Sequence, residues 1–123
     1  MRTPIPILEI DDLLVVSIQI ELDDQSALQL QYDLAAKLSR TGSCGIVIDF
    51  TAVQVVDSFI AKVVGDIARI TRLMGANLVV TGLNPQVALT LVDLGIDLAG
   101  VTTALNLQKG IDFLRKKRSG YGR

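Results

Sequence analysis

The chain contains no histidine, no tryptophan and a single cysteine among its 123 residues. Without histidine, the usual zinc sites and Ser-His catalytic sites lose their commonest member. The lone cysteine, Cys44, cannot form an internal disulfide, and neither a base nor a second cysteine adjoins it in the sequence. The composition therefore argues against metal sites and Ser-His hydrolase chemistry, and we expect no cofactor.

Long apolar runs are also absent. Apolar stretches such as Leu13–Ile20 fall well short of the ~20 residues that a membrane-spanning helix needs. The segment Met1–Glu9 carries one arginine, two prolines and one glutamate, unlike the charged head and apolar run of a signal peptide. The sequence therefore predicts a cytoplasmic protein that has no membrane among its partners.

Acidic and basic residues nearly balance, at 13 against 12, but the basic ones gather at the C-terminal end. Five of them lie within the last nine positions: Arg115, Lys116, Lys117, Arg118 and Arg123. Cations at a helix C-terminus interact favourably with the helix dipole, so we interpret the cluster as a solvated helix end rather than a nucleic-acid site. We expect one domain over residues 1–118 and a frayed basic tail over residues 119–123.

The first half of the chain predicts two strands, a helix and a further strand. Ile5–Ile10 and Leu13–Ile20 favour strands joined by a turn at Asp11 and Asp12. A helix should begin at Asp23 or Asp24 and end at Gly42. Its apolar positions at helical spacing are Leu28, Tyr32, Ala35 and Leu38. The apolar run Gly45–Phe50 lacks polar alternation and predicts a strand at the centre of the sheet.

The second half alternates helices and strands. Asp57 or Ser58 can cap a helix that ends before Gly75, with one apolar face of Ile60, Val63, Val64, Ile67 and Met74. The next expected elements are a strand at Leu78–Thr81, a helix opened by Asn84-Pro85 with Val87, Leu91 and Leu94 before Gly95, a short strand near Val101, and a helix with Leu107, Ile111 and Leu114. The predicted fold is an α/β domain with a mixed, mostly parallel sheet of about 4–5 strands and about four helices.

The segment between Phe50 and the helix at Ser58 is the candidate functional site. A serine in the first turn of a helix lies among unpaired backbone N–H groups at the positive end of the dipole, where a phosphate would be held favourably. An ordinary N-cap at Asp57 or Ser58 explains the same residues without any function. Asp57 would repel an added phosphate, so modification of Ser58 should alter the local surface.

Two acidic patterns suggest other chemistry. Asp49, the pair Asp11-Asp12 and Thr81 lie roughly where a phosphoaspartate receiver keeps its phosphoacceptor, its metal-binding acids and its hydroxyl. Against that class, Leu13–Ile20 favours a strand where a receiver needs a helix, and no lysine follows the last strand. The paired acids Asp23 and Asp24 could bind a metal, but acids at a helix start are usually caps.

Four segments of the chain resemble STAS domains of the anti-sigma-factor antagonist family, and in particular the short single-domain scaffold proteins of the stressosome. These segments are Glu21–Gln25, Val56–Val63, Arg72–Ala76 and Thr81–Pro85. The resemblance covers roughly Pro4–Leu114. A free antagonist of the family usually has a second hydroxyl residue and a glycine where this chain has Phe59 and Ile60, which favours the scaffold over the free antagonist.

The resemblance implies a non-catalytic scaffold that sequesters a serine kinase and releases it when Ser58 is phosphorylated, within the general stress pathway that controls a sigma factor. Asp57, Phe59, Ile60 and Lys62 would contact partners. These partners would be the kinase, paralogous STAS sensor proteins and a resetting phosphatase. A mean hydropathy of +0.46 also indicates apolar surface shared with other subunits in a homo- or hetero-oligomer.

Overall fold

The computed structural model describes residues 5–19, 21–94 and 101–118, which form one five-stranded sheet and four helices. The strands are β1 (Leu8–Ile10), β2 (Leu13–Ser17), β3 (Gly45–Asp49), β4 (Asn77–Thr81) and β5 (Thr102–Ala104). The helices are α1 (Asp24–Thr41), α2 (Ser58–Leu73), α3 (Pro85–Asp93) and α4 (Leu107–Arg118). The predicted α/β class and the predicted number of elements are confirmed.

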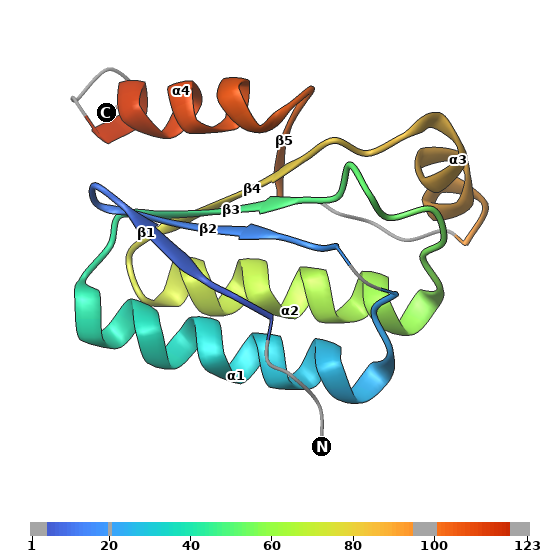
Figure 1. The fold of residues 1–123 in the computed structure, drawn as a ribbon, viewed down its shortest axis with the longest axis horizontal. Helices are drawn as coiled ribbons and strands as arrows, with labels where there is room; N and C mark the ends of the chain where they lie inside the picture. The colour runs from blue at the N-terminus through green and yellow to red at the C-terminus, as the bar shows by residue number, and fades with distance from the viewer. Residues whose placement is uncertain (1–4, 20, 95–100, 119–123) are drawn as a thin grey trace.

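The strands lie side by side in sequence order, from β1 to β5 (Figure 1). β1 and β2 are antiparallel and are joined at Asp11, whose φ of 55° is left-handed. Every later pair is parallel, because a helix returns the chain to the starting edge before the next strand begins. Both strands of the hairpin are shorter than the sequence predicts, and Ile20 and Gly95 lie outside the described residues.

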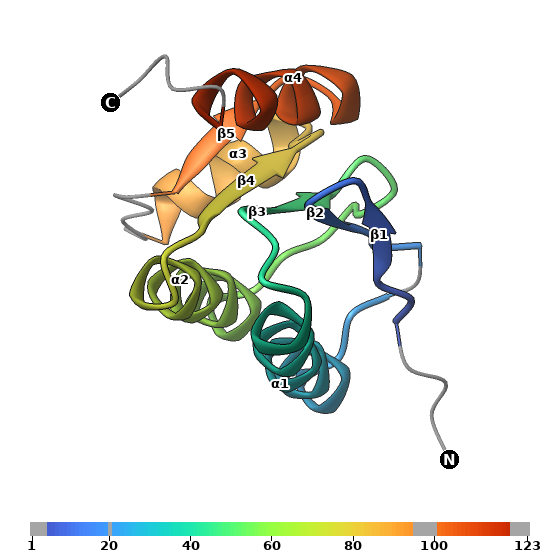
Figure 2. The same cartoon turned by 90° about the vertical axis from the view of Figure 1, so that its left-hand side faces the viewer.

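The central strand β3 is buried on both faces, as its lack of polar alternation predicts. Ile46 and Ile48 point into a large apolar cluster beneath the sheet, where α1 and α2 pack. Val47 belongs to a smaller cluster on the opposite face, together with Val15, Val79 and Leu114. Viewed along the layers, α1 and α2 lie under the sheet and α4 lies over it (Figure 2).

Helix α1 buries a different stripe from the one that the sequence analysis selected. The stripe that faces the core consists of Ala27, Leu30, Leu34 and Leu38. Leu28 and Tyr32 point outward, with 51% and 71% of their surface exposed. Both series of apolar residues have helical spacing. The series that contains three leucines faces the core. Of the four apolar positions that the sequence spacing singles out, only Leu38 belongs to the buried stripe.

The ends of α1 and α2 follow capping chemistry. The Asp23 carboxylate accepts a hydrogen bond from the Ser26 amide at 2.7 Å, and Gly42 closes α1 in a left-handed conformation with φ 65°. Helix α2 ends at Leu73, so Met74 lies beyond it and is 42% exposed rather than part of the apolar face.

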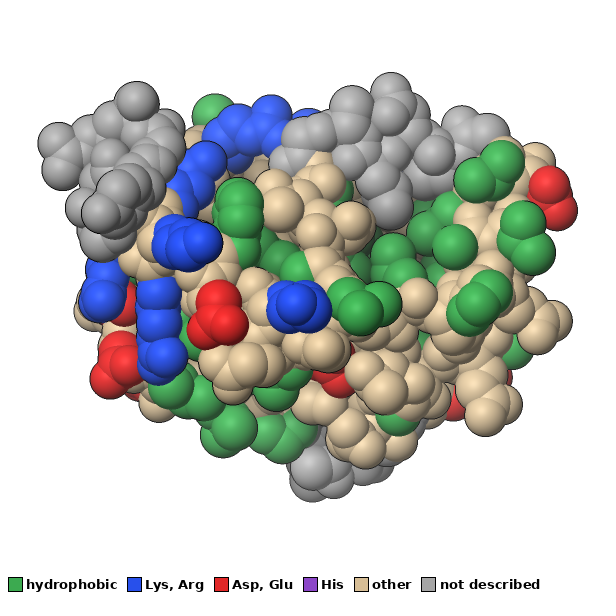
Figure 3. Space-filling view, turned by 90° about the horizontal axis from the view of Figure 1, so that it is seen from above, with side chains coloured by type: hydrophobic (Ala, Val, Ile, Leu, Met, Phe, Trp, Pro, Cys, Tyr) green, Lys and Arg blue, Asp and Glu red, His purple; other side chains and the backbone are tan. Residues whose placement is uncertain are grey.

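Helix α4 lies close to the upper face of the sheet and is tied to the β1–β2 hairpin. At Gly110 an added Cβ would lie 2.6 Å from the Thr81 methyl group, so only glycine allows this approach. Arg115 pairs with Asp11 at 3.0 Å, and Arg118 pairs with Asp12 at 2.9 Å. Figure 3 shows lysine and arginine side chains gathered over α4. The predicted tail at residues 119–123 lies outside the described residues.

We expect Val47→Asp to unfold the domain, because Val47 is fully buried and an unpaired buried carboxylate costs several kcal/mol. A domain of this size has only ~5–15 kcal/mol of stability. Val92→Asp is the matched control, since Val92 is 73% exposed on α3 and its variant should melt near the parent temperature. A Val47→Asp protein with the parent melting temperature would contradict the placement of β3.

A second prediction concerns the pH dependence of the α4 contact with the hairpin. Burial raises the pKa of Asp12, but hydrogen bonds from Arg118 and Cys44 outweigh it and hold the pKa below the ordinary 3.8. The ionised carboxylate therefore stabilises the fold above pH 3.8, and this contribution is lost as the pH falls through the folded pKa. Urea denaturation should show that Asp12→Asn has a lower free energy of unfolding than the parent at pH 7, and that this difference disappears at low pH. A difference of equal size at pH 7 and at low pH would contradict the ion pair.

Candidate functional site

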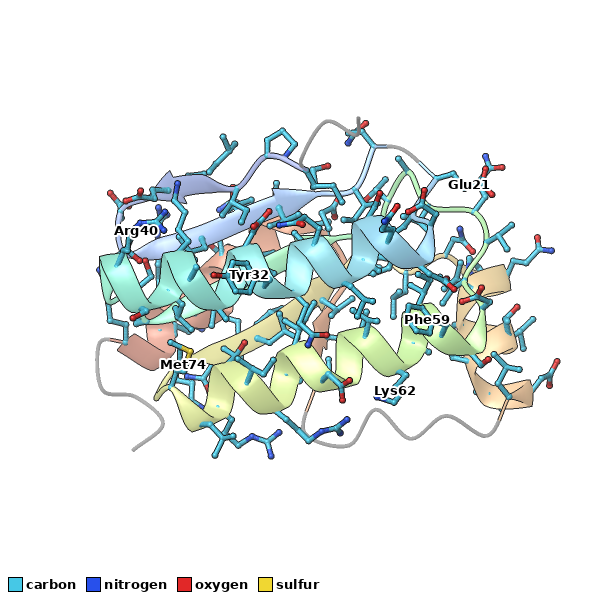
Figure 4. The ribbon with its side chains drawn as sticks, turned by 90° about the horizontal axis from the view of Figure 1, so that it is seen from below. Glu21, Tyr32, Arg40, Phe59, Lys62 and Met74 are labelled. Carbon is cyan, nitrogen blue, oxygen red and sulfur yellow. The ribbon has the colours of Figure 1, made fainter. Side chains whose placement is uncertain are left out.

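The candidate site lies at the edge of the sheet where the parallel strands end. Helices α1, α2 and α3 each begin at this edge, because each follows directly from the carboxyl end of a strand (Figure 1). Seen from below, α1 and α2 run in the same direction, and Glu21 and Phe59 mark their starting ends (Figure 4). The positive ends of the helix dipoles therefore meet at one edge.

Ser58 is the first residue of α2 and is exposed at that edge. The residue before it, Asp57, is the N-cap, and its carboxylate accepts a hydrogen bond from the Ile60 amide at 2.9 Å. Of the two cap residues that the sequence leaves open, the structure therefore uses Asp57. Ser58 therefore lies at the positive end of the helix dipole, next to the cap, and is exposed.

The segment that leads to Ser58 is fixed by alternating buried and exposed valines. Val53 and Val56 are buried in the core cluster below the sheet, whereas Val55 is 80% exposed between them. The Val53 amide donates to the Phe50 carbonyl at 2.9 Å, which closes a turn just after β3. The loop is therefore anchored on both sides of the exposed Val55.

An open acidic cleft adjoins the start of α2. Its lining residues are Glu21, Leu22, Asp23, Asp24, Gln25 and Asp57. Asp23 and Asp57 cap α1 and α2 with their carboxylates, whereas Glu21 and Asp24 are exposed. A phosphate on Ser58 would add negative charge beside a surface that is already acidic.

The residues after Ser58 have different surroundings. Phe59 is half-buried against the core, and Lys62 is exposed and pairs with Asp66 at 2.8 Å. Hydrogen bonds from Lys62 and Arg69 lower the pKa of Asp66. Ile60 is only 4% exposed and belongs to the core cluster. The expectation that Ile60 contacts a partner was therefore wrong, because its side chain is used in folding the domain.

Asp49 is not available as a phosphoacceptor. Its carboxylate is buried and accepts hydrogen bonds from the Thr81 hydroxyl at 2.6 Å and the Thr51 hydroxyl at 3.0 Å. Asp11 and Asp12 lie in the β1–β2 turn and pair with α4. The strand β2 occupies the place where a receiver would have its first helix, so the receiver interpretation was wrong.

Within the described residues, no group of three or more cysteine or carboxylate side chains could hold a metal ion. The apolar cavity between α2, α3 and the sheet measures about 20 Å³, which is comparable to the space that a single water molecule needs. Cys44 donates to Asp12 at 3.3 Å, and burial raises the pKa of its thiol.

No helix in the described part of the chain is long and apolar enough to span a bilayer.

Two features of this edge escaped the sequence analysis. Asn84 was predicted as the cap of α3, but its amide also reaches the Val53 carbonyl. The outer face of α3 is apolar, with Leu89 64% and Val92 73% exposed, and Figure 3 shows it at the opposite end of the molecule from the cations of α4. Spacing alone gave no signal for the long-range bond, whereas the excess of apolar residues in α3 was visible in the sequence.

The fold and this edge match a known family. A family model described as the STAS domain matches residues 4–113. The chain therefore belongs to the STAS domain family, which confirms the resemblance stated from the sequence.

Among solved structures, the chain is similar to a serine-to-glutamate variant of RsbS from Moorella thermoacetica. The two are 43% identical with a TM-score of 0.84, and the match covers 95% of this chain and 99% of the other. A chain in a structure of the stressosome, described as a signal integration and transduction hub, is 45% identical with a TM-score of 0.80, over 92% of this chain and 98% of that chain.

Among curated proteins, the RsbT co-antagonist protein RsbRA of Bacillus subtilis is 35% identical over 107 residues. The match includes 87% of this chain but only 38% of RsbRA. The chain thus spans less than two-fifths of the length of this relative.

The capping geometry generates a prediction about Asp57. Replacing an aspartate N-cap by alanine costs about 0.5–2 kcal/mol, because the first-turn amide loses its acceptor. We expect Asp57→Ala to lower the free energy of unfolding by this amount. Asp57→Asn should retain most of the parent's stability, and Ser58→Ala should change the free energy of unfolding little. Chemical denaturation measures all three variants. A larger loss in Ser58→Ala than in Asp57→Ala would make Ser58 the cap.

Proposed function

We propose that this chain is a non-catalytic scaffold of a stressosome-type assembly, which sequesters a serine kinase and releases it when Ser58 is phosphorylated. The observation that carries the proposal is the position of Ser58, exposed at the start of α2 beside an acidic cleft. The similarity to RsbS and to a stressosome chain over more than nine-tenths of this chain supports it.

The surroundings of Ser58 explain how a phosphate could change binding without unfolding the domain. A phosphate adds about −1.5 to −2 charges at neutral pH. The exposed N–H groups and the dipole of α2 stabilise such a charge by about 0.3–1 kcal/mol. The exposed carboxylates of the adjoining cleft repel it, but the high dielectric of water keeps each repulsion to about 1 kcal/mol or less. These effects are small against the stability of a domain, so the fold survives.

A bound partner changes this balance. Docking over Ser58 removes water from the phosphate while Asp57 and the acidic cleft remain beside it. A charge that is desolvated without an opposite charge is costly, so the complex dissociates rather than bury it. Phe59 follows Ser58 in the first turn of α2, and Lys62 lies one turn further along. We assign both to the partner contact together with Asp57.

The further partners follow from the relatives. The similarity to RsbRA supports assembly with paralogous STAS proteins, and its described role as a co-antagonist supports a function in antagonism rather than catalysis. We include a resetting phosphatase, because a scaffold switched by phosphorylation needs a return step. The output would be the general stress pathway, which acts on a sigma factor.

We expect Ser58→Asp to melt within a few degrees of the parent and to bind the host's candidate serine kinase at least tenfold more weakly. Tenfold corresponds to about 1.4 kcal/mol, which is within reach of one added charge at an interface. Ser58→Ala should bind like the parent and resist phosphorylation. Calorimetry, intact-mass analysis with ATP and site mapping provide the readouts.

The matched control is Ser39→Asp, which places the same charge on an exposed serine of α1 far along the chain from the site. Its binding should equal that of the parent. Equal labelling of Ser58→Ala and the parent would place the switch elsewhere. The alternative function, a free antagonist that binds an anti-sigma kinase, predicts that size-exclusion chromatography finds no assembly with a paralogous STAS protein.

A further inference from the structure

One side chain joins the loop before Ser58 to the start of α3. The Oδ1 atom of Asn84 accepts a hydrogen bond from the Val87 amide at 2.8 Å, which caps the helix. Its Nδ2 atom donates to the Val53 carbonyl at 3.0 Å, across a separation of 31 residues. The Asn84 side-chain amide therefore bonds the loop before α2 through its nitrogen and the first turn of α3 through its oxygen.

The Val53 side chain is buried and its amide is bonded within the loop, so the bond from Asn84 adds a tie between the Val53 carbonyl and α3. The Val53 amide donates to Phe50, and the Phe50 amide donates to the Thr81 carbonyl at 2.8 Å, so this turn is fastened to the sheet. The carbonyl of Val53 faces the other way, toward Asn84. Beyond it the chain passes the exposed Val55 before it reaches Ser58.

We propose that Asn84 is a positioning residue for the phosphorylation loop, because its Nδ2–H group fixes the path of the loop relative to α3 and so the presentation of Ser58. The proposal rests on the proposed function of Ser58. When the bond is absent, the loop samples other paths, and a kinase that binds only the seated loop binds with an apparent affinity reduced by the seated fraction.

The chemistry of the cap separates this role from a structural one. Aspartate and serine cap helices about as well as asparagine does, but only asparagine combines an acceptor with an NH₂ donor at its tip. Asn84→Asp and Asn84→Ser therefore keep the cap of α3 and lose the bond to Val53. If Asn84→Asp and Asn84→Ser give the same result in the test below, the negative charge of the aspartate is not the cause.

Asn106 provides the matched control. It caps α4 in the same manner, with its Oδ1 atom accepting from the Lys109 amide at 2.9 Å. Asn106→Asp and Asn106→Ser make the same chemical changes at another helix, so they report what a cap substitution does without the bond to Val53.

The test measures amide hydrogen exchange at Val53 by NMR and, separately, the kinetics of Ser58 phosphorylation by the kinase that labels it. The Val53 amide donates to Phe50 and not to Asn84, so its exchange reports how often this turn opens. If the bond from Asn84 holds the turn closed by about 0.5–1.5 kcal/mol, its loss makes this exchange about two- to tenfold faster. We expect this increase in both Asn84 variants, with a higher KM of the kinase for the scaffold and an unchanged kcat. The Asn106 variants should match the parent in both measurements.

Three other outcomes would each contradict a specific part of the proposal. Parent-like exchange at Val53 in the Asn84 variants overturns the bond as a restraint on the loop. Faster exchange with an unchanged KM overturns the positioning role. If no kinase labels Ser58 in the parent, the proposed function fails, and the exchange rates alone then decide whether Asn84 restrains the loop.

Discussion

The burial of β3 on both faces is the constraint on which the rest of the structure depends. A strand without a polar face needs a layer of helices above and below it. Helices α1 and α2 supply one layer and α4 the other. Because parallel strands all start at the same edge of the sheet, α1 and α2 each carry the chain back beneath the sheet from the end of one strand to the start of the next. Their starting ends, and with them Ser58, are thereby brought to one edge.

The site at that edge combines stable and exposed parts. Ile60, Val53 and Val56 bury their side chains and hold the backbone, whereas Ser58 and Val55 are exposed between them. Residues close in sequence thus have separate tasks, one in the core and one at the surface. The exclusion of Ile60 from the partner surface follows directly, since a side chain that packs in the core cannot also contact a second protein.

The sequence predicted the elements and the central strand because these depend on local patterns. The run Gly45–Phe50, the caps at Asp23 and Asp57, and the glycine at Gly42 each act over a few residues. It did not predict which stripe of α1 is buried, because Leu28 and Leu30 both belong to regular helical series and only packing selects between them. The second bond of Asn84 was also out of reach, since it depends on how two loops meet in space.

The shortness of β1 and β5 limits how copies of this domain can meet. Each of these outer strands has three residues, so a neighbouring chain that extended the sheet would gain only a short ladder of backbone hydrogen bonds. Short outer strands are a recognised protection against edge-to-edge aggregation. If copies of this domain meet, contacts made by helices and loops would leave the sheet as it is. The outward-facing apolar residues of α1 and α3 belong to helices and not to an outer strand.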